Sequence, residues 1–430
     1  MKSVEEVVEI KQSVEKEIMS MKGVTGIDVG YKYKNGRRTS EVSIRVHVAK
    51  KMKTVPKGQS IPKEIEGVST DVLQDVFEPQ WLKVKEDEVI AFADVASYSP
   101  LIGGISIGPD RVIGGYVYVG TLGAPVIDKT NNKTVMLSNF HVMCVDTNWS
   151  VGDIMDQPGR VDGGTIANRV GTLKRSSLSA HVDGAISAID AGKTTKCQIK
   201  DIGNIKGTAS AVLNAPVRKR GRTTLLTYGF VDAINATLSV DYGPGLGTKT
   251  FTNQIGVRPD VSHNPKFSDH GDSGSVVVDA NNKVVGLLFA GNSSGYTYMN
   301  PINFVLSELN IKLCTATVVK PTKEFKEFKN EKNEKIEIKE AKHEKIEFKE
   351  YKIEKLEHKE FKDGKSEFEL PKLIETKIPG IGFTSATGAG DSDVEQRLAA
   401  IEAALGEMSA FISQNIRPDL SHGAYTNEEE

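Results

Sequence analysis

The chain has 430 residues, of which 55 are Lys or Arg and 57 are Asp or Glu, and its formal net charge is −2. This length exceeds one ordinary domain, and the near-neutral charge argues against a protein that binds nucleic acid by neutralising phosphates. From this charge we expect no nucleic-acid partner. No apolar stretch approaches a bilayer span and the first residues lack a signal-peptide pattern, so we also expect no association with a membrane.

Residues 1–80 predict a small α+β N-terminal domain. Ser3 and Glu6 have the spacing of a capping box, and the apolar residues that follow recur at helical intervals. A strand begins near Val24, the pair Asn35 and Gly36 predicts a hairpin turn, and alternating apolar residues predict a second strand. Two roles stay open for this domain: a prodomain or substrate-presenting module, and a stabilising appendage.

Three residues suited to acyl transfer follow between residues 81 and 317. His141 ends an apolar strand, and imidazole is the usual general base near neutral pH. Asp183 starts an apolar stretch, where a carboxylate needs a hydrogen-bonding partner such as an imidazole N–H. Ser273 lies between glycines, so the amides of Gly271 and Ser273 can converge into an oxyanion hole. The order His, Asp, Ser, with gaps of about 40 and 90 residues, is one known order of a catalytic triad.

Six short motifs carry a resemblance to a known family. They lie at residues 106–108 (Ser-Ile-Gly), 120–123 (Gly-Thr-Leu-Gly), 138–142 (Ser-Asn-Phe-His-Val), 182–185 (Val-Asp-Gly-Ala), 221–224 (Gly-Arg-Thr-Thr) and 271–274 (Gly-Asp-Ser-Gly). With them the chain resembles the trypsin-like (chymotrypsin-fold) serine peptidases, in a bacterial and plant branch without a signal peptide. The resemblance implies a mainly β fold over residues 81–317, with two antiparallel six-stranded β-barrels. It also implies that His141 is the general base, Asp183 orients it and Ser273 attacks.

Three features set the chain apart from trypsin. Phe140 is bulky where relatives often carry a small or polar residue, so it could crowd the site. Gly184 replaces a residue that is commonly Ala, which we expect to change little. In trypsin a freed N-terminus pairs with the aspartate before the nucleophile, whereas here a whole domain precedes that region. We therefore expect Asp272 not to wait for a new amine, and the peptidase to be active or regulated without that step.

A Gly-Asp-Ser-Gly tetrapeptide by itself is more often an ordinary turn, and other histidines are alternative bases. His270 lies three residues before the serine, but on a tight turn so near a neighbour usually points away. His181 lies two residues before the aspartate, and we interpret it as an exposed residue at a strand end. His47 and His263 have no supporting motif. The order and spacing therefore favour His141.

The family resemblance also locates the primary substrate pocket. It falls near Phe267 and along the strand that contains Phe289, Ala290 and Gly291. None of these residues is acidic, so a preference for Lys or Arg is not expected and a neutral or apolar side chain is favoured. The glycine-rich residues 243–247 lack the lysine and the strand–helix context of a phosphate loop. We expect no cofactor and no metal.

The three cysteines are Cys144, Cys197 and Cys314, with no CxxC pair and no even-numbered set. Secreted relatives of trypsin are typically held by disulfides. We therefore expect no disulfide framework, a reducing compartment and a cytoplasmic location.

The composition changes abruptly after residue 317. Residues 318–370 form a Lys/Glu-rich spacer with a repeat of about ten residues, for which a flexible charged chain is favoured over a folded repeat. His343 and His358 belong to this repeat and are not interpreted as metal ligands. Residues 371–392 read as a linker because they are rich in Gly, Pro and small residues.

A short coiled-coil helix is predicted at residues 393–417, where apolar residues alternate at spacings of four and three. Helices of this length seldom stand alone in water, so we expect a homo-oligomer, with docking on a partner or on its own barrel as the alternatives. Residues 418–430 are expected to be a disordered tail.

The sequence predicts an intracellular serine endopeptidase that acts on protein or peptide substrates. The alternative is a catalytically silent structural or scaffold protein on a peptidase fold, assembled through its C-terminal helix. A third hypothesis is self-processing, in which the only physiological cut lies in the chain's own linker. The complete set of triad residues favours the endopeptidase.

Overall fold

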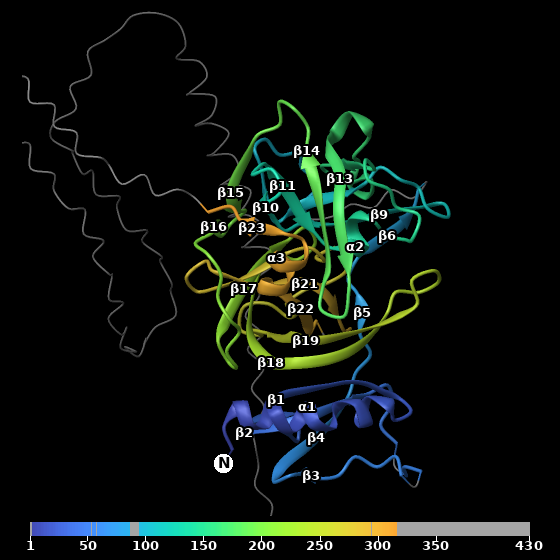
Figure 1. Cartoon of the computed structure of the whole chain (residues 1–430), viewed down its shortest axis with the longest axis vertical. Coiled ribbons are helices and arrows are strands. Elements are labelled where there is room, and N and C mark those ends of the chain that lie inside the picture. Colours follow the sequence, from blue (N-terminus) through green and yellow to red (C-terminus); the bar gives the residue numbers. More distant parts are fainter. Residues whose placement is uncertain (1, 53, 57, 87–93, 294, 316–430) are drawn as a thin grey trace, which may run out of the picture. The chain divides into compact units, whose positions relative to one another are not determined.

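Strands dominate the structure, a computed structural model that describes residues 2–52, 54–56, 58–86, 94–293 and 295–315 (Figure 1). The prediction of a mainly β fold is confirmed. All of these described residues belong to one compact unit. None of the helices in this part has both the length and the apolarity needed to span a bilayer. The predicted spacer, linker, coiled-coil helix and tail at 318–430 lie outside the described residues.

The N-terminal segment folds as its capping box and turn predict. Ser3 Oγ accepts a hydrogen bond from Glu6 N, the Glu6 carboxylate accepts one from Ser3 N, and helix α1 (Val4–Ser20) follows. Strands β1 (Val24–Lys34) and β2 (Arg37–Val48) form a hairpin, with Asn35 and Gly36 in the left-handed region at φ 51° and 74°. Figure 1 shows α1 lying along these strands, and its buried apolar face packs against them.

One sheet of eleven strands contains the N-terminal hairpin and most of the strands after residue 215. Its order is β17-β20-β21-β22-β19-β18-β1-β2-β4-β3, and a further pairing of β17 with β18 closes the first six strands into a ring. The elements not yet given are β17 (Pro216–Gly221), β20 (Val276–Asp279), β21 (Val284–Gly291), β22 (Thr297–Pro301), β19 (Thr248–Pro259), β18 (Leu225–Asp241), β4 (Val68–Gln74), β3 (Glu64–Ile65) and β5 (Glu78–Pro79), which pairs with β21.

A second sheet has nine strands in the order β23-β10-β11-β14-β13-β12-β8-β9-β6, and a small sheet has the order β16-β15-β7. These elements are β23 (Ile311–Leu313), β10 (Ala124–Asp128), β11 (Thr134–Ser138), β14 (Asp183–Ile189), β13 (Arg169–Leu178), β12 (Ile154–Asp156), β8 (Ile105–Pro109), β9 (Tyr116–Leu122), β6 (Leu82–Lys85), β16 (Gly203–Asn204), β15 (Thr195–Ile199) and β7 (Leu101–Gly103). Helices α2 (Phe140–Met143) and α3 (Ile302–Glu308) and the 3-10 turns η1 (Arg160–Asp162) and η2 (Ile166–Asn168) complete the set. The arrangement as two six-stranded barrels stays a prediction.

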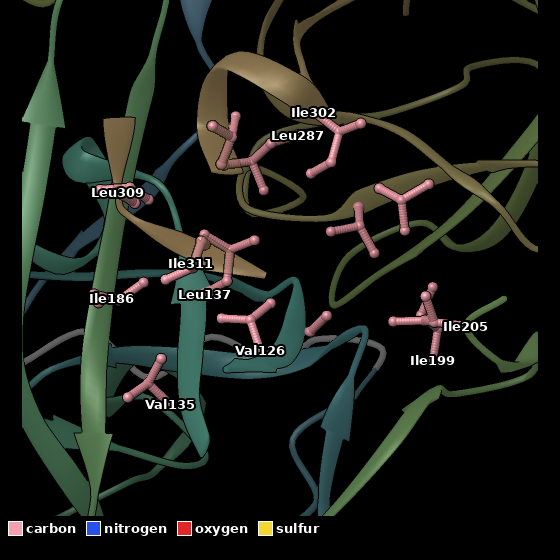
Figure 2. Packing of buried hydrophobic residues seen from close by; sticks show 14 of the residues in the cluster. Val126, Val135, Leu137, Ile186, Ile199, Ile205, Leu287, Ile302, Leu309 and Ile311 are labelled. Atoms are coloured by element: carbon pink, nitrogen blue, oxygen red, sulfur yellow. The ribbon is translucent and has the colours of Figure 1, made fainter. Parts of the chain in front are cut away.

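A buried apolar cluster is shared by the two large sheets. Figure 2 shows Val126 and Ile186 of the nine-stranded sheet near Leu309 and Ile311 at the end of the described chain. Leu287 of β21 belongs to the same cluster. Full burial of one such aliphatic side chain contributes about 1.5–3 kcal/mol. The segment from α3 to β23 therefore helps to hold the two sheets together.

Two of the three cysteines are paired, which corrects the expectation that the fold has no disulfide. Cys197 in β15 and Cys314 after β23 form a disulfide across 117 residues of sequence, while Cys144 is free and buried. Both strands pack beside β10, and this common neighbour brings the cysteines together. Because the pairing depends on tertiary structure, no short cysteine motif in the sequence predicts it. The cytoplasmic location stays a prediction.

A buried ion-pair network joins the N-terminal hairpin to the six-stranded ring. Arg45 of β2 binds Asp28 of β1 and Asp232 of β18, with both N–O distances at 2.6 Å. His47 lies 3.0 Å from carboxylate oxygens of both Asp28 and Asp75. Burial lowers the pKa of His47, but the neighbouring carboxylates outweigh this effect and raise the pKa above its ordinary value. The network therefore favours the charged form of His47.

This network predicts that the free energy of unfolding decreases as the pH rises above about 6.5, the ordinary pKa of histidine. Since the pKa of His47 is higher in the folded chain, its stabilisation is complete below that pH and is lost as the pH rises through the folded value. Denaturant unfolding at a series of pH values measures this. His47→Gln should flatten the profile, whereas His263→Gln, at an exposed loop position, should not. An unaltered profile in His47→Gln would contradict the assignment.

Candidate active site

His141 and Asp183 meet because strands β11 and β14 pair antiparallel. Helix α2 follows β11 and Asp183 begins β14, so the two residues lie at the same end of the pair. His141 Nδ1 lies 2.5 Å from Asp183 Oδ2, and His141 N donates to Asp183 Oδ1 at 3.1 Å. Both side chains are fully buried. Because a carboxylate oxygen accepts hydrogen bonds, Nδ1 is the donor in this contact and Nε2 is the ring nitrogen left for another partner.

A buried tyrosine that the sequence did not indicate completes the surroundings of this carboxylate. Tyr242 OH donates to Asp183 Oδ2 at 2.6 Å. Burial raises the pKa of Tyr242 well above its ordinary value, and the Asp183 charge raises it further, so the phenol stays a donor. Asn139 Nδ2 donates to the backbone oxygen of Asp183 at 2.6 Å. The carboxylate itself thus has three donors, which are the two N–H groups of His141 and the Tyr242 hydroxyl. A buried polar group requires such partners.

Ser273 lies on a tight turn whose flanking positions require glycine. Gly271 and Gly274 have φ of 97° and 93°, in the region that other residues rarely adopt. A Cβ on Gly274 would lie 2.2 Å from Ser138 Oγ, and one on Gly271 would lie 2.4 Å from Thr223 Oγ1. The turn therefore packs tightly between β9, β11 and the β17–β18 turn.

The structure does not join Ser273 to His141 by a hydrogen bond. Ser273 Oγ donates instead to Phe289 O at 3.2 Å. Within the described residues, His141 Nε2 is buried without a hydrogen-bond partner. The nitrogen that would act as the base is therefore free of a hydrogen bond, although it is covered by the surrounding side chains.

The aspartate before the nucleophile already has a cationic partner. Asp272 Oδ2 lies 3.1 Å from Lys219 Nζ, and both side chains are fully buried. Burial lowers the pKa of Lys219, and the Asp272 carboxylate opposes that effect. The other carboxylate oxygen accepts hydrogen bonds from the amides of Thr223 and Thr224, at 2.9 and 3.1 Å. These contacts explain the motif at 221–224 and support the expectation that no freed N-terminus is needed.

The two amides predicted to form an oxyanion hole donate to a single carbonyl oxygen, that of Gln80. The distances to this oxygen are 2.7 Å from Gly271 N and 3.4 Å from Ser273 N. The amides therefore converge on one point, and a backbone carbonyl of the chain itself occupies it.

The side chain of Gln80 is buried and hydrogen-bonded to a hydroxyl group. Ser268 Oγ hydrogen-bonds to Gln80 Oε1 and to Thr297 Oγ1, and all three side chains are at most 3% exposed. Two residues predicted for the primary substrate pocket contact Gln80. The backbone oxygen of Phe289 accepts a hydrogen bond from Gln80 N at 3.2 Å. Gly291 lies against the amide, since a Cβ there would be 2.2 Å from Gln80 Nε2. Ser268 and Thr297 were missed because isolated hydroxyls form no motif.

Each of the other residues predicted near the substrate pocket or the base lies in a different part of the fold. Ala290 pairs opposite Pro79 of β5. Phe267 is buried in an apolar cluster. Phe140 does not crowd the site, because it packs in the core against Trp149 with ring centroids 6.3 Å apart.

The other histidines of the described residues contact different partners. His270 Nδ1 lies 3.1 Å from Trp81 O, and His181 stacks on Phe304 with centroids 4.8 Å apart. His47 belongs to the buried ion-pair network, and His263 binds an aspartate in an exposed loop. In this part of the chain, no group of three or more His, Cys, Asp or Glu side chains is placed to hold a metal ion.

No family model matches the sequence, and no curated protein is similar to it. Among solved structures, protease A of Thermobifida fusca is 20% identical, with a TM-score of 0.37 over 50% of this chain and 98% of that chain. A Nocardiopsis protease is 20% identical, with a TM-score of 0.37 over 52% of this chain and 100% of that chain. A chymotrypsin of Cellulomonas bogoriensis is 24% identical, with a TM-score of 0.35 over 50% and 98%. The chain resembles trypsin-like, chymotrypsin-fold serine peptidases.

Proposed function

We propose that the chain is a serine endopeptidase in which His141, Asp183 and Ser273 act together on protein or peptide substrates. One observation carries the proposal. The His141 imidazole is oriented by Asp183, its Nε2 has no hydrogen-bond partner, and beside it lies a peptide whose carbonyl oxygen accepts hydrogen bonds from two backbone amides. The Trp81 ring, one residue after that carbonyl, has its centroid 5.5 Å from that of the His141 ring. The donors that an acyl-transfer site needs are therefore directed at a peptide group.

In this mechanism Ser273 Oγ first turns from Phe289 O toward His141 Nε2. It then attacks the carbonyl carbon while Nε2 takes its proton, and the amides of Gly271 and Ser273 stabilise the oxyanion. The imidazolium gives the proton to the leaving amine, and water activated in the same way hydrolyses the acyl-enzyme. Asp183 accepts the hydrogen bond from Nδ1 and so orients Nε2 toward the nucleophile.

A catalytically silent scaffold is the second candidate. The observation in its favour is that Ser273 Oγ hydrogen-bonds to Phe289 O and not to His141 Nε2. A serine fixed in that position would not be activated. Catalytic hydrogen bonds often form only when a substrate is bound, so the endopeptidase remains the better-supported proposal.

Reaction with a fluorophosphonate probe tests the endopeptidase. We expect the full-length protein to be labelled when residues 78–81 move out of the site, because Ser273 is buried with Gln80 O in the oxyanion hole and the probe reacts with activated serines. Ser273→Ala and His141→Ala should abolish the labelling, since they remove the nucleophile and the base. Ser262→Ala, at an exposed loop position, should leave it unchanged. A folded wild-type protein that is never labelled would favour the scaffold.

Two further predictions accompany this function. Self-association through residues 393–417 would gather several catalytic domains on charged tethers and raise their local concentration on polyvalent substrates. A cytoplasmic location is also proposed, and a non-reducing gel of protein taken from cells would report the state of the Cys197–Cys314 pair.

A further inference from the structure

Residues 78–81 cross the candidate site in the manner of a bound peptide. Strand β5 runs antiparallel to the end of β21, with Pro79 opposite Ala290. The pairing continues by one hydrogen bond, from Gln80 N to Phe289 O at 3.2 Å. This segment therefore adds a short strand beside the nucleophile turn, which is one of the ways in which extended peptides bind proteins.

One peptide bond of this segment lies at the reacting groups. The oxygen of Gln80 accepts hydrogen bonds from Gly271 N and Ser273 N. The next residue, Trp81, has its ring centroid 5.5 Å from that of His141, in an edge-to-face contact. The carbonyl of the Gln80–Trp81 bond is thus bound by the amide of the nucleophile, and the Trp81 side chain contacts the base.

The pocket around the Gln80 side chain matches a neutral amide. Ser268 Oγ donates to Gln80 Oε1 and accepts from Thr297 Oγ1, so a chain of two hydroxyls ends on the amide oxygen. The three residues are buried, and a buried amide without such a partner would be costly. A lysine in place of Gln80 would meet the hydroxyl of Ser268 where its charge requires a carboxylate.

Contacts on the far side of the bond hold Trp81 in place. Its ring packs edge-to-face against Tyr118 and Tyr242, with centroid distances of 5.5 and 6.4 Å. A hydrogen bond joins its backbone oxygen to His270 Nδ1 at 3.1 Å. Trp81 also lines a cavity of about 640 Å³. The bond is therefore held on both sides, which is the condition for an intramolecular reaction to be fast.

We infer that the chain cuts its own peptide bond between Gln80 and Trp81, and that its primary pocket is built for glutamine. This inference rests on the proposed function, since the cut uses the same nucleophile and base. The bond lies at the boundary predicted between the N-terminal domain and the peptidase domain.

The reaction balances with one molecule of water. Ser273 Oγ forms an ester with the carbonyl carbon of Gln80, and the C–N bond to Trp81 breaks. The serine proton passes through His141 to the departing amine of Trp81. Water then hydrolyses the ester, which restores the serine and leaves a free carboxylate on Gln80.

Intact-mass spectrometry and N-terminal sequencing of the incubated full-length protein test the inference. The wild type should yield a chain that begins at Trp81, at a rate independent of protein concentration. Ser273→Ala should lose the cut. Gln80→Lys should also lose it, and a circular dichroism spectrum unchanged from that of the wild type would show that the chain remains folded. Gln12→Lys makes the same change on the exposed face of α1 and should be cut like the wild type.

The outcomes separate this inference from the proposed function. A wild type that reacts with the probe but keeps the Gln80–Trp81 bond, or is cut only elsewhere, overturns self-cleavage and leaves the endopeptidase standing. A folded protein with neither cut nor labelling overturns both. Cleavage of Gln80→Lys at the wild-type rate overturns the glutamine pocket.

Discussion

Asp183→Asn is expected to lower kcat/KM for peptide hydrolysis by about 10⁴-fold while leaving the chain folded. The carboxylate accepts a hydrogen bond from His141 Nδ1 at 2.5 Å and so keeps Nε2 free of a proton. An asparagine amide can instead donate to Nδ1, and the proton then moves to Nε2. In that tautomer the imidazole cannot take the proton of Ser273. The loss should appear in kcat, because the exchange does not touch the substrate pocket.

The rate of hydrolysis of a glutamine-containing peptide and the rate of fluorophosphonate labelling both measure this effect. Asp190→Asn is a matched control, since Asp190 binds Arg169 at a partly exposed position away from the site. It should keep almost full activity. A loss of less than about tenfold in a folded Asp183→Asn protein would contradict the role assigned to this carboxylate.

Lys219→Met is expected to lower the free energy of unfolding by about 3–5 kcal/mol and to abolish labelling of Ser273. The substitution leaves the buried Asp272 carboxylate without its cation, 3.1 Å away in the wild type. Asp272 is the residue before the nucleophile, and its backbone lies between the two amides that hold the carbonyl. Relaxation of this carboxylate toward water would move those amides away from their common point.

Urea unfolding measures the first effect, and the surface pair Lys266–Asp269 provides the control. These two side chains are 43% and 37% exposed, so Lys266→Met should cost less than about 1 kcal/mol. The double substitution Lys219→Met with Asp272→Asn should recover part of the lost stability, because it removes the uncompensated charge. Equal losses for Lys219→Met and Lys266→Met would show that the buried pair has no special role.

Local signals allowed part of this structure to be predicted. The capping box at Ser3 and the turn at Asn35 and Gly36 act within a few residues, so short sequence windows contain them. The positions of His141 and Asp183 followed from their places at the ends of apolar strands, and the structure brings the two side chains into contact. Their roles in catalysis, together with that of Ser273, remain a proposal that the labelling experiment tests.

Other features depend on contacts between segments that lie far apart in the sequence. Tyr242 reaches Asp183 from the end of β18, and Lys219 reaches Asp272 across 53 residues. The disulfide between Cys197 and Cys314 spans 117 residues. In the sequence, Gln80 is only the last residue of the predicted N-terminal domain, because no motif distinguishes a peptide that occupies a site from an ordinary linker. Each of these features requires the tertiary fold before it can be recognised.

During synthesis of the chain, β1 must wait for its pairing partner β18. Strand β1 (Val24–Lys34) is made early, but β18 (Leu225–Asp241), which covers one of its edges, is made much later. At about 5–20 residues per second, a ribosome needs about 10–40 s to reach that partner. During this interval β1 has an unpaired edge, the kind of surface at which strands of neighbouring chains associate. Closely spaced ribosomes on the message are therefore expected to favour association of neighbouring chains through this edge.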